Sequence, residues 1–477
     1  MEVWVQQNDP KHCSGAASRC PRSKLFYLSI RGGSGTCHGR IWRREGHVRL
    51  YGFRQSTPTL VAEQLLRLAG NALHMRHKVF GIWTLRRGNC HGAGRHGLSN
   101  LRGKVSRAHS LEIDGQFSIN LDFVSYNTHG LIRPFKRIFT DTFGPPRRPD
   151  EPIADCHRDL AYALQSTLEA TILHIVRALS RSCPSRNLCL SGGVALNCVA
   201  NARILSDSDY KCIWVPPCAS DSGAPLGSAL WHYHQTLGHP RGFELTHPFY
   251  GLAYSDSEIT SALRHAGLTP QRMSEHNLVS RVARDLAEGK IVGWFQGRFE
   301  MGPRALGNRS ILADARNGAI RDQLNTRVKN REAFRPFAPA VLVERVSEFF
   351  EINQSDPFMA IAPRVRADKT HLIPAAVHVD GTARIQTVDR AVNPRFYGVI
   401  EEFAKLTKIP VILNTSFNQR EPMVARPEDA ISCYLRTGMD VLVLGDFYIT
   451  DHGASERGRR GELLSCVSND LIAEASA

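Results

Sequence analysis

The order of apolar and polar residues becomes regular from about residue 106 onward. Residues 110–122 alternate apolar and polar side chains around Asp114-Gly115, a dipeptide that favours tight hairpin turns. Apolar residues then recur every three or four positions from Leu160 to Leu179, which predicts one long amphipathic helix. Short apolar runs at 187–190 and 212–215 follow helical segments, so we expect helices and strands to alternate as in an α/β domain.

A second α/β domain is predicted to begin near Leu278, after a polar, turn-rich connection. Its expected elements are helices at 278–289, 397–406 and 427–436 and strands at 290–296, 409–414 and 440–448, with one further helix at 256–266 in the connection. The chain is therefore predicted to have five parts: a basic segment at 1–105, a first α/β domain at 106–240, a connection at 241–277, a second α/β domain at 278–455 and a polar tail at 456–477.

Positive charge is concentrated in the first of these parts. The net charge is +15, and residues 1–105 hold 18 Lys and Arg against 4 Asp and Glu, whereas the remaining residues hold 42 against 41. The rest of the chain is thus close to neutral, and a near-neutral net charge is what we expect of an enzyme. Three interpretations of residues 1–105 stay open: a basic arm that binds phosphates, a degenerate or out-of-frame segment, and a genuine but divergent fold.

Several kinds of protein and site are disfavoured by the sequence. No apolar run reaches about 18 residues and no charged-then-apolar leader follows Met1, so we expect no membrane span and a cytoplasmic location. The 12 cysteines include no C-x-x-C pair and no Cys/His cluster with the spacing of zinc ligands. No Ser/His/Asp constellation and no H-E-x-x-H motif emerges either.

Two glycine-containing turns follow predicted strands of the first α/β domain. Ser191-Gly192-Gly193 stands between a strand and a helix, where paired glycines let the backbone approach a phosphate, although such turns also serve tight packing. Asp221, in the second turn, is placed either to hold a divalent cation or a ribose hydroxyl or to act simply as a helix N-cap. Each turn alone is a weak signal.

The richest candidate chemistry lies in the second α/β domain. Residues 296–316 carry four arginines among glycines, and guanidinium groups suit phosphate oxygens, so we expect a structured loop that lines a pocket. These arginines are Arg298, Arg304, Arg309 and Arg316, and Lys329, Arg331 and Arg335 extend the basic region. Hydroxyl, amide and basic donors also lie beside predicted strands in the segments 378–384 (HVDGTAR) and 413–418 (LNTSFN), although Asn and Ser are also ordinary turn formers.

Together, these motifs closely resemble the nodulation and antibiotic O-carbamoyltransferase family. The matching segments occur in the family's order: LSGGVALNCVANARIL, GWFQGRFEMGPRALGNRSILADAR, NREAFRPFAPAVL, HVDGTARIQTV and ILNTSFNQREP. The resemblance covers residues from about 106 to 450. It implies an α/β fold in which a partial actin/sugar-kinase-like (ASKHA) domain is followed by a smaller domain similar to threonylcarbamoyl-adenylate synthase.

The resemblance also implies a reaction and the residues that perform it. In such enzymes the second domain turns ATP and carbamoyl phosphate into carbamoyl-adenylate, and the first transfers the carbamoyl group to a hydroxyl of a small, sugar-like acceptor, here expected to be a lipo-chitooligosaccharide nodulation factor. The matching residues are Arg304, Lys329 and Arg335 as catalytic groups, Arg384, Asn414 and Ser416 at the adenylate, Gly192 and Gly193 at the nucleotide phosphates, and Asp221 as a ligand of a divalent metal, Fe or Mg.

Rival predictions arise from the first part of the chain. The family's first domain opens with an aspartate-bearing phosphate loop, a His-rich metal motif of the HHxxHA type and a DGxG-like acid, and none of these is found before Ser106. One alternative is therefore a catalytically incomplete remnant, or a subunit that needs a complementing N-terminal chain. Another is a related RNA-modifying enzyme that uses the basic segment as an RNA arm. Otherwise we expect no nucleic-acid partner, and we leave a homodimer open.

Overall fold

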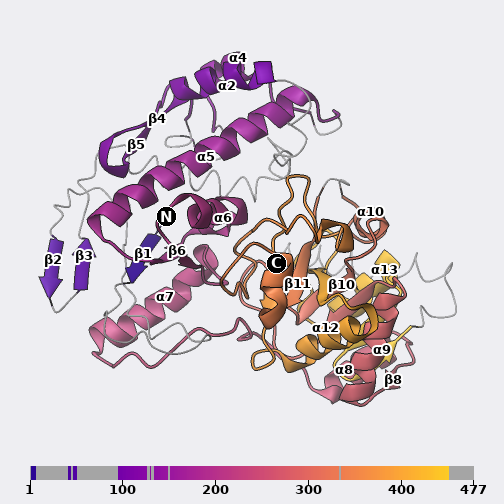
Figure 1. Ribbon diagram of the computed structural model, residues 1–477. Helices are drawn as coiled ribbons and strands as arrows, with labels where there is room; N and C mark the ends of the chain where they lie inside the picture. Colours follow the sequence, from indigo (N-terminus) through magenta and orange to yellow (C-terminus); the bar gives the residue numbers. More distant parts are fainter. Residues whose placement is uncertain are drawn as a thin grey trace. The chain divides into compact units, whose positions relative to one another are not determined.

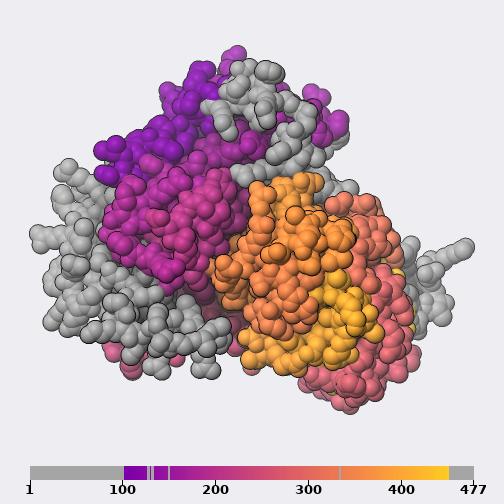
Figure 2. Space-filling view, in the orientation of Figure 1, coloured from indigo at the N-terminus to yellow at the C-terminus, as the bar shows by residue number. Residues whose placement is uncertain are grey.

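The structure is a computed structural model that describes residues 2–6, 41–44, 47–50, 95–125, 129, 134–148, 151–331 and 335–450. The chain divides into two compact units, and both mix helices with strands, which confirms the α/β class in general terms (Figure 1). Unit 1 comprises Met1–Leu245, Ala360–Arg364 and His378–Arg384, and unit 2 comprises Thr246–Met359, Val365–Val377 and Ile385–Ala477. Most of the predicted basic segment and all of the polar tail lie outside the described residues. Figure 2 shows the residues whose side chains are described in a space-filling view, coloured along the sequence.

Unit 1 is organised around one long helix, α5 (Asp155–Ser182), which confirms the helix predicted from the apolar spacing. It buries an apolar stripe that includes Leu160, Ile172 and Val176. Helices α2 (Arg95–Ala108) and α6 (Cys198–Asp207) both contact α5 and lie on either side of it in Figure 1. The further helices of this unit include α4 (Arg137–Phe143) and α7 (Ala224–Trp231).

The strands of unit 1 form one small sheet and two hairpins. In the sheet, β6 (Asn187–Ser191) lies between β1 (Glu2–Gln6), which is antiparallel to it, and β7 (Cys212–Trp214), which is parallel. Strands β2 (Ile41–Arg44) and β3 (His47–Leu50) form one antiparallel pair. Strands β4 (His109–Leu111) and β5 (Phe117–Ile119) form the other and confirm the hairpin predicted around Asp114-Gly115, where both residues adopt positive φ.

Unit 2 is built on an eight-stranded mixed sheet in the order β12-β11-β13-β10-β9-β14-β15-β8. Its strands are β8 (Gln271–Arg272), β9 (Val292–Phe295), β10 (Arg309–Asp314), β11 (Ala338–Leu342), β12 (Gln386–Val388), β13 (Val411–Ser416), β14 (Val441–Leu444) and β15 (Phe447–Ile449). The strands β9, β10, β11 and β14 are buried along their whole length, so the centre of the sheet is the core of the unit.

Helices cover this sheet. Helices α9 (Glu275–Ala287) and α12 (Pro394–Thr407) pack against each other, side by side in Figure 1, and share one apolar cluster with alternate residues of the strands, among them Trp294 and Val443. Helix α13 (Pro427–Thr437) contacts β9, β14 and helix α8 (Asp256–His265). The shorter helices are α10 (Ala319–Gln323) and α11 (Val346–Phe349). Among the described residues, no helix has both the length and the apolar character that a membrane crossing demands.

Two predicted elements of the second domain were wrong. The single strand expected at 440–448 is a hairpin of β14 and β15, because Gly445 adopts a positive φ of 57° and reverses the chain. The loop expected over 296–316 ends at Asn308, and its second half is the fully buried strand β10. The run Ile311-Leu312-Ala313 explains this, since a continuous apolar run is typical of a strand buried on both faces.

Candidate active site

Strand β13 presents two of the predicted site residues on one face of the sheet of unit 2. Asn414 and Ser416 are alternate residues of this strand, so their side chains point to the same side. The Asn414 side chain is fully buried, and its Nδ2 donates to Gln386 Oε1 (2.7 Å) and to the carbonyl of Ala305 (3.4 Å). Ala305 directly follows Arg304. Asn414 therefore holds the turn that carries Arg304.

The same turn is fixed from inside by Glu300, which is only 2% exposed. Its Oε1 accepts hydrogen bonds from the backbone N–H groups of Leu306 (3.1 Å), Asn308 (2.7 Å) and Arg309 (2.8 Å). Burial raises the pKa of Glu300 above its ordinary value, although these hydrogen bonds act in the opposite direction. Gly307, within the turn, adopts a φ of 107°, and a Cβ there would lie 2.5 Å from the Phe396 ring. The position of Arg304 is thus set by buried groups.

Lys329 is a buried basic residue of the site, and its side chain reaches the end of β13. The residue follows the short π-helix Leu324–Val328 and is 2% exposed. Its Nζ donates to the carbonyl and hydroxyl of Ser416 and to the carbonyl (2.8 Å) and Oδ1 (2.7 Å) of Asn418. None of these oxygens belongs to a carboxylate. Burial and the charge of Arg331 lower the pKa of Lys329 to about 7.

The backbone of Arg335 is hydrogen-bonded to Asn325, which lies in the π-helix Leu324–Val328 just before Lys329. The buried Asn325 donates from Nδ2 to the Arg335 carbonyl (3.0 Å) and accepts from Arg331 Nε at its Oδ1 (2.8 Å). The Arg331 guanidinium lies 4.7 Å from the centre of the Phe337 ring. Five predicted site residues are therefore joined by hydrogen bonds and short chain segments in unit 2: Arg304, Lys329, Arg335, Asn414 and Ser416.

The other three arginines of the segment 296–316 have structural contacts. Arg309 is completely buried, lies 3.6 Å from the centre of the Phe295 ring and donates to the carbonyls of Gln296, Gly297 and Asn308. Its burial lowers its pKa to about 10. Arg316 forms an ion pair with Asp314 (2.7 Å), and Arg298 donates to the carbonyl of Gly251 (3.3 Å). Arg309 is thus a structural residue, contrary to the expected phosphate contact.

The two predicted turns of unit 1 meet in space. Gly192 adopts a φ of 90°, which favours glycine, and its N–H donates to the carbonyl of Ala219 (2.6 Å), two residues before Asp221. Gly193 opens a 3-10 turn that ends at Leu196. Asp221 is exposed and makes no side-chain cap, since the N-cap residue of α7 is Gly223, so the alternative of a simple helix N-cap is not realised.

Asp221 belongs to no cluster of three or more potential metal ligands in the described part of the chain. Over those residues, no group of three or more His, Cys, Asp and Glu side chains gathers in a way that would hold a metal ion. The described donor set therefore does not fit a metal centre by itself, and the metal remains a prediction of the resemblance.

Arg384, the remaining predicted site residue, belongs to unit 1. Its neighbour Ala383 donates from the backbone to the carbonyl of Pro363 (3.0 Å). The segment Ala360–Arg364 is in turn bound to α6, because Asn201 Nδ2 donates both to the Ala360 carbonyl (2.8 Å) and to the Ala195 carbonyl (2.7 Å) just after the Gly192 turn. Two short segments from the second predicted domain are therefore built into unit 1.

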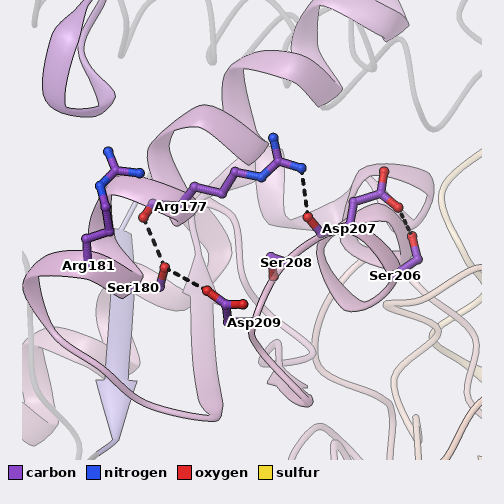
Figure 3. A pocket seen from close by; sticks show the side chains of 7 residues that line it. All are labelled: Arg177, Ser180, Arg181, Ser206, Asp207, Ser208 and Asp209. Atoms are coloured by element: carbon purple, nitrogen blue, oxygen red, sulfur yellow. Dashed lines mark hydrogen bonds between the residues drawn. The ribbon is translucent and has the colours of Figure 1, made fainter.

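A separate pocket of unit 1 contains none of the predicted site residues (Figure 3). Within it, Arg177 donates to the carbonyl of Asp207 (2.9 Å), and Ser180 donates to the carbonyl of Arg177 (3.0 Å) and faces Asp209 at 3.4 Å. Several polar groups that line this pocket are thus hydrogen-bonded to one another. The lining residues are Arg177, Ser180, Arg181, Ser206, Asp207, Ser208 and Asp209.

Comparison with known families identifies the chain. Residues 96–230 match the family model for the carbamoyltransferase N-terminus, and residues 283–451 match that for the carbamoyltransferase C-terminus. The chain belongs to the carbamoyltransferase family. This confirms the resemblance found in the sequence, and the two matched regions of the chain contain all nine predicted site residues.

Known proteins similar to this chain include nodulation proteins. NolO of Bradyrhizobium diazoefficiens is 41% identical over 334 residues, which are 67% of this chain and 60% of that protein. An uncharacterised protein of Synechocystis is 40% identical over 375 residues, 73% of this chain and 61% of that one. The 3'-hydroxymethylcephem-O-carbamoyltransferase of Streptomyces clavuligerus is 36% identical over 270 residues, 55% of this chain and 48% of that one. The aligned part of the chain thus spans between about half and six-tenths of the length of these relatives.

Proposed function

We propose that the chain forms carbamoyl-adenylate in unit 2 from ATP and carbamoyl phosphate, with consumption of one water and release of pyrophosphate and inorganic phosphate. The carbamoyl group is then transferred to an acceptor hydroxyl in unit 1. The acceptor class in the proposal is a sugar-like small molecule, specifically a lipo-chitooligosaccharide nodulation factor. The family membership supports carbamoyl transfer, and the similarity to nodulation proteins supports the acceptor class. The proposal also assigns the ASKHA-like fold to unit 1 and the threonylcarbamoyl-adenylate-synthase-like fold to unit 2.

The observation that carries the proposal is the buried arrangement of Lys329 at the end of β13, beside Ser416 and Asn418. Adenylate formation moves negative charge onto the departing pyrophosphate, and a cation held in a buried site stabilises that charge strongly. Among the residues that the structure describes, the hydrogen-bond partners of Lys329 are neutral oxygens, so a bound phosphate would give it an anionic partner. In the proposal, Arg304 and Arg335 supply further positive charge to the phosphates.

Asn414 adds a group suited to the carbamoyl or adenine part of the ligand. Its Oδ1 is buried and has no hydrogen-bond partner among the residues that the structure describes. A buried amide oxygen of this kind is satisfied by an N–H donor, which both the carbamoyl amide and the adenine amino group possess. In the proposal, Arg384 also contacts the adenylate, whereas the Gly192-Gly193 turn holds a nucleotide phosphate and Asp221 contributes to a divalent metal site, Fe or Mg. No step depends on the metal.

The proposal is tested by pyrophosphate release from the full chain, supplied with MgATP with and without carbamoyl phosphate. We expect release that depends on carbamoyl phosphate and that falls by about 100-fold in Arg335→Ala, the size of effect typical for the loss of a charge-stabilising group. A matched control is Arg366→Ala, because the Arg366 side chain is 50% exposed and its Nε lies 3.5 Å from Oδ1 of Asp368, which is itself exposed. Folded wild-type protein that releases no carbamoyl-phosphate-dependent pyrophosphate would overturn the proposal.

A further inference from the structure

His378 is a buried histidine whose surroundings fix the position of its protons. It is 4% exposed and opens the segment His378–Arg384 of unit 1. Its Nδ1 lies 2.9 Å from Thr382 Oγ1, which in turn lies 2.6 Å from Asp380 Oδ1. Backbone hydrogen bonds between His378 and Thr382 (2.8 Å) and from Gly381 to His378 (2.9 Å) close the turn around these three side chains.

The hydrogen-bond chain determines the tautomer. An ionised carboxylate only accepts hydrogen bonds, so the hydroxyl proton of Thr382 must point to Asp380. Thr382 Oγ1 then accepts from His378, which requires the neutral imidazole to carry its proton on Nδ1. The other ring nitrogen, Nε2, therefore has a free lone pair.

That lone pair has no protein partner in the described part of the chain, although Nε2 is buried. Buried polar atoms in folded proteins are nearly always hydrogen-bonded, and an exception calls for a ligand. The missing partner must bring a proton, which means an O–H or N–H donor. The chain from Asp380 through Thr382 would also stabilise the positive charge if His378 accepted that proton fully.

The position of the segment points to the transfer step. His378 belongs to unit 1, where Thr382 pairs with Arg364 in an antiparallel bridge, and Ala362 donates from its backbone to the carbonyl of Cys198 (3.0 Å) at the start of α6. The segment is thus anchored to the helix that follows the Gly192 turn. In the proposed function, unit 1 is the unit that carries out transfer to the acceptor hydroxyl.

We propose that His378 is the general base of carbamoyl transfer, an inference that rests on the proposed function. The acceptor oxygen forms a bond to the carbamoyl carbon, while the bond from that carbon to the phosphate oxygen of the adenylate breaks. AMP leaves with the electron pair of that bond, and the hydroxyl proton moves to His378 Nε2. The resulting imidazolium donates from Nδ1 to Thr382, which donates to Asp380, and Nε2 releases its proton once the products have left the site.

The test compares two kinds of nucleophile with the full chain, MgATP and labelled carbamoyl phosphate. Chitotetraose and glycerol serve as hydroxyl probes, which need a base to become good nucleophiles. Hydroxylamine serves as a probe that attacks without deprotonation and yields hydroxyurea. We expect His378→Gln to lower O-carbamoylation of the hydroxyl probes by about 100-fold or more, the range for loss of a general base, while hydroxyurea formation stays within about threefold of wild type.

A second variant covers the case in which His378→Gln does not fold. Thr382→Val preserves the side-chain volume and removes the hydroxyl, so it should lower O-carbamoylation by about tenfold and leave hydroxyurea formation unchanged. Val379→Ala is the matched control, because Val379 lies in the same turn and is 56% exposed.

Equal loss of both products in the folded variants would show a purely structural role and overturn the assignment, as would undiminished O-carbamoylation. A failure of the proposed function itself would be seen separately, as wild-type protein without carbamoyl-phosphate-dependent pyrophosphate release.

Discussion

Binding of a phosphate-bearing ligand beside Lys329 should be coupled to the uptake of a proton. The ammonium group is buried among neutral oxygens of Ser416 and Asn418, and burial together with the charge of Arg331 lowers its pKa from 10.5 to about 7. In the free protein above neutral pH, Lys329 is therefore mostly uncharged. A bound phosphate adds a negative charge to the one that Glu421 already contributes and raises the pKa of Lys329, so we expect the bound lysine to be protonated.

The size of the effect follows from the pKa of the free protein. At pH 8 a group with a pKa of about 7 is only about one-tenth protonated, so restoring its charge takes up about 0.9 proton per ligand. At pH 6 the uptake falls to about 0.1 proton, because the group is already charged. The same linkage weakens ligand binding about fivefold between pH 7 and pH 8.

Isothermal titration calorimetry measures this uptake directly. Carbamoyl phosphate is titrated into the full chain at pH 8 in buffers of different ionisation enthalpy, and the dependence of the observed heat on that enthalpy gives the number of protons. Lys329→Met should bring the uptake close to zero. Lys405→Met is the matched control, since Lys405 is 61% exposed and pairs with Glu402 on the surface. Binding by wild-type protein without proton uptake, or an unchanged uptake in Lys329→Met, would refute the reasoning.

Three further predictions concern groups that support the site. Glu300→Ala leaves three buried N–H groups without an acceptor and should lower the free energy of unfolding by about 3 kcal/mol or more in urea titrations, whereas Glu300→Gln, which keeps an acceptor oxygen, should cost less. Although burial raises the pKa of Glu421, backbone hydrogen bonds and the charge of Arg436 outweigh it and lower the pKa to about 2. Glu421 therefore contributes stability that is present above its ordinary pKa of 4.5 and lost as the pH falls toward 2, so Glu421→Gln should flatten the acid limb of the unfolding curve. Asn201→Ala removes the hydrogen bonds that Asn201 donates to the carbonyls of Ala195 and Ala360 and should lower the unfolding free energy by about 2 kcal/mol. An unchanged urea midpoint would contradict this expectation.

The elements with a clear apolar period were predictable from the sequence. The spacing from Leu160 to Leu179 predicted α5, and Asp114-Gly115 predicted the hairpin of β4 and β5, because local sequence alone determines both patterns. The hairpin of β14 and β15 was missed although Gly445-Asp446 is a known turn dipeptide, since apolar residues on both sides of it read as one continuous strand.

The candidate site was predictable only where its residues lie in recognisable motifs. Arg304, Lys329, Asn414 and Ser416 were assigned through the family resemblance, and the structure links them by hydrogen bonds and adjacency in the chain. The groups that support them were not assigned from the sequence. Gln386, for example, donates to the carbonyl of Leu306, which lies 80 residues away, and accepts from Asn414, which lies 28 residues away. Such contacts depend on the order of strands in the sheet, which no local pattern specifies.

Activation of the carbamoyl group as an adenylate is the central step of the proposed function. The most direct measurement is mass spectrometry of the nucleotides after rapid quenching of full-length protein incubated with MgATP and carbon-13-labelled carbamoyl phosphate. We expect a species with the mass of AMP carrying one labelled carbamoyl group, formed together with pyrophosphate. The same species should be absent from reactions of the Lys329→Met variant. Nucleotide products limited to ADP and unlabelled AMP, from folded protein that binds both substrates, would contradict the proposed function.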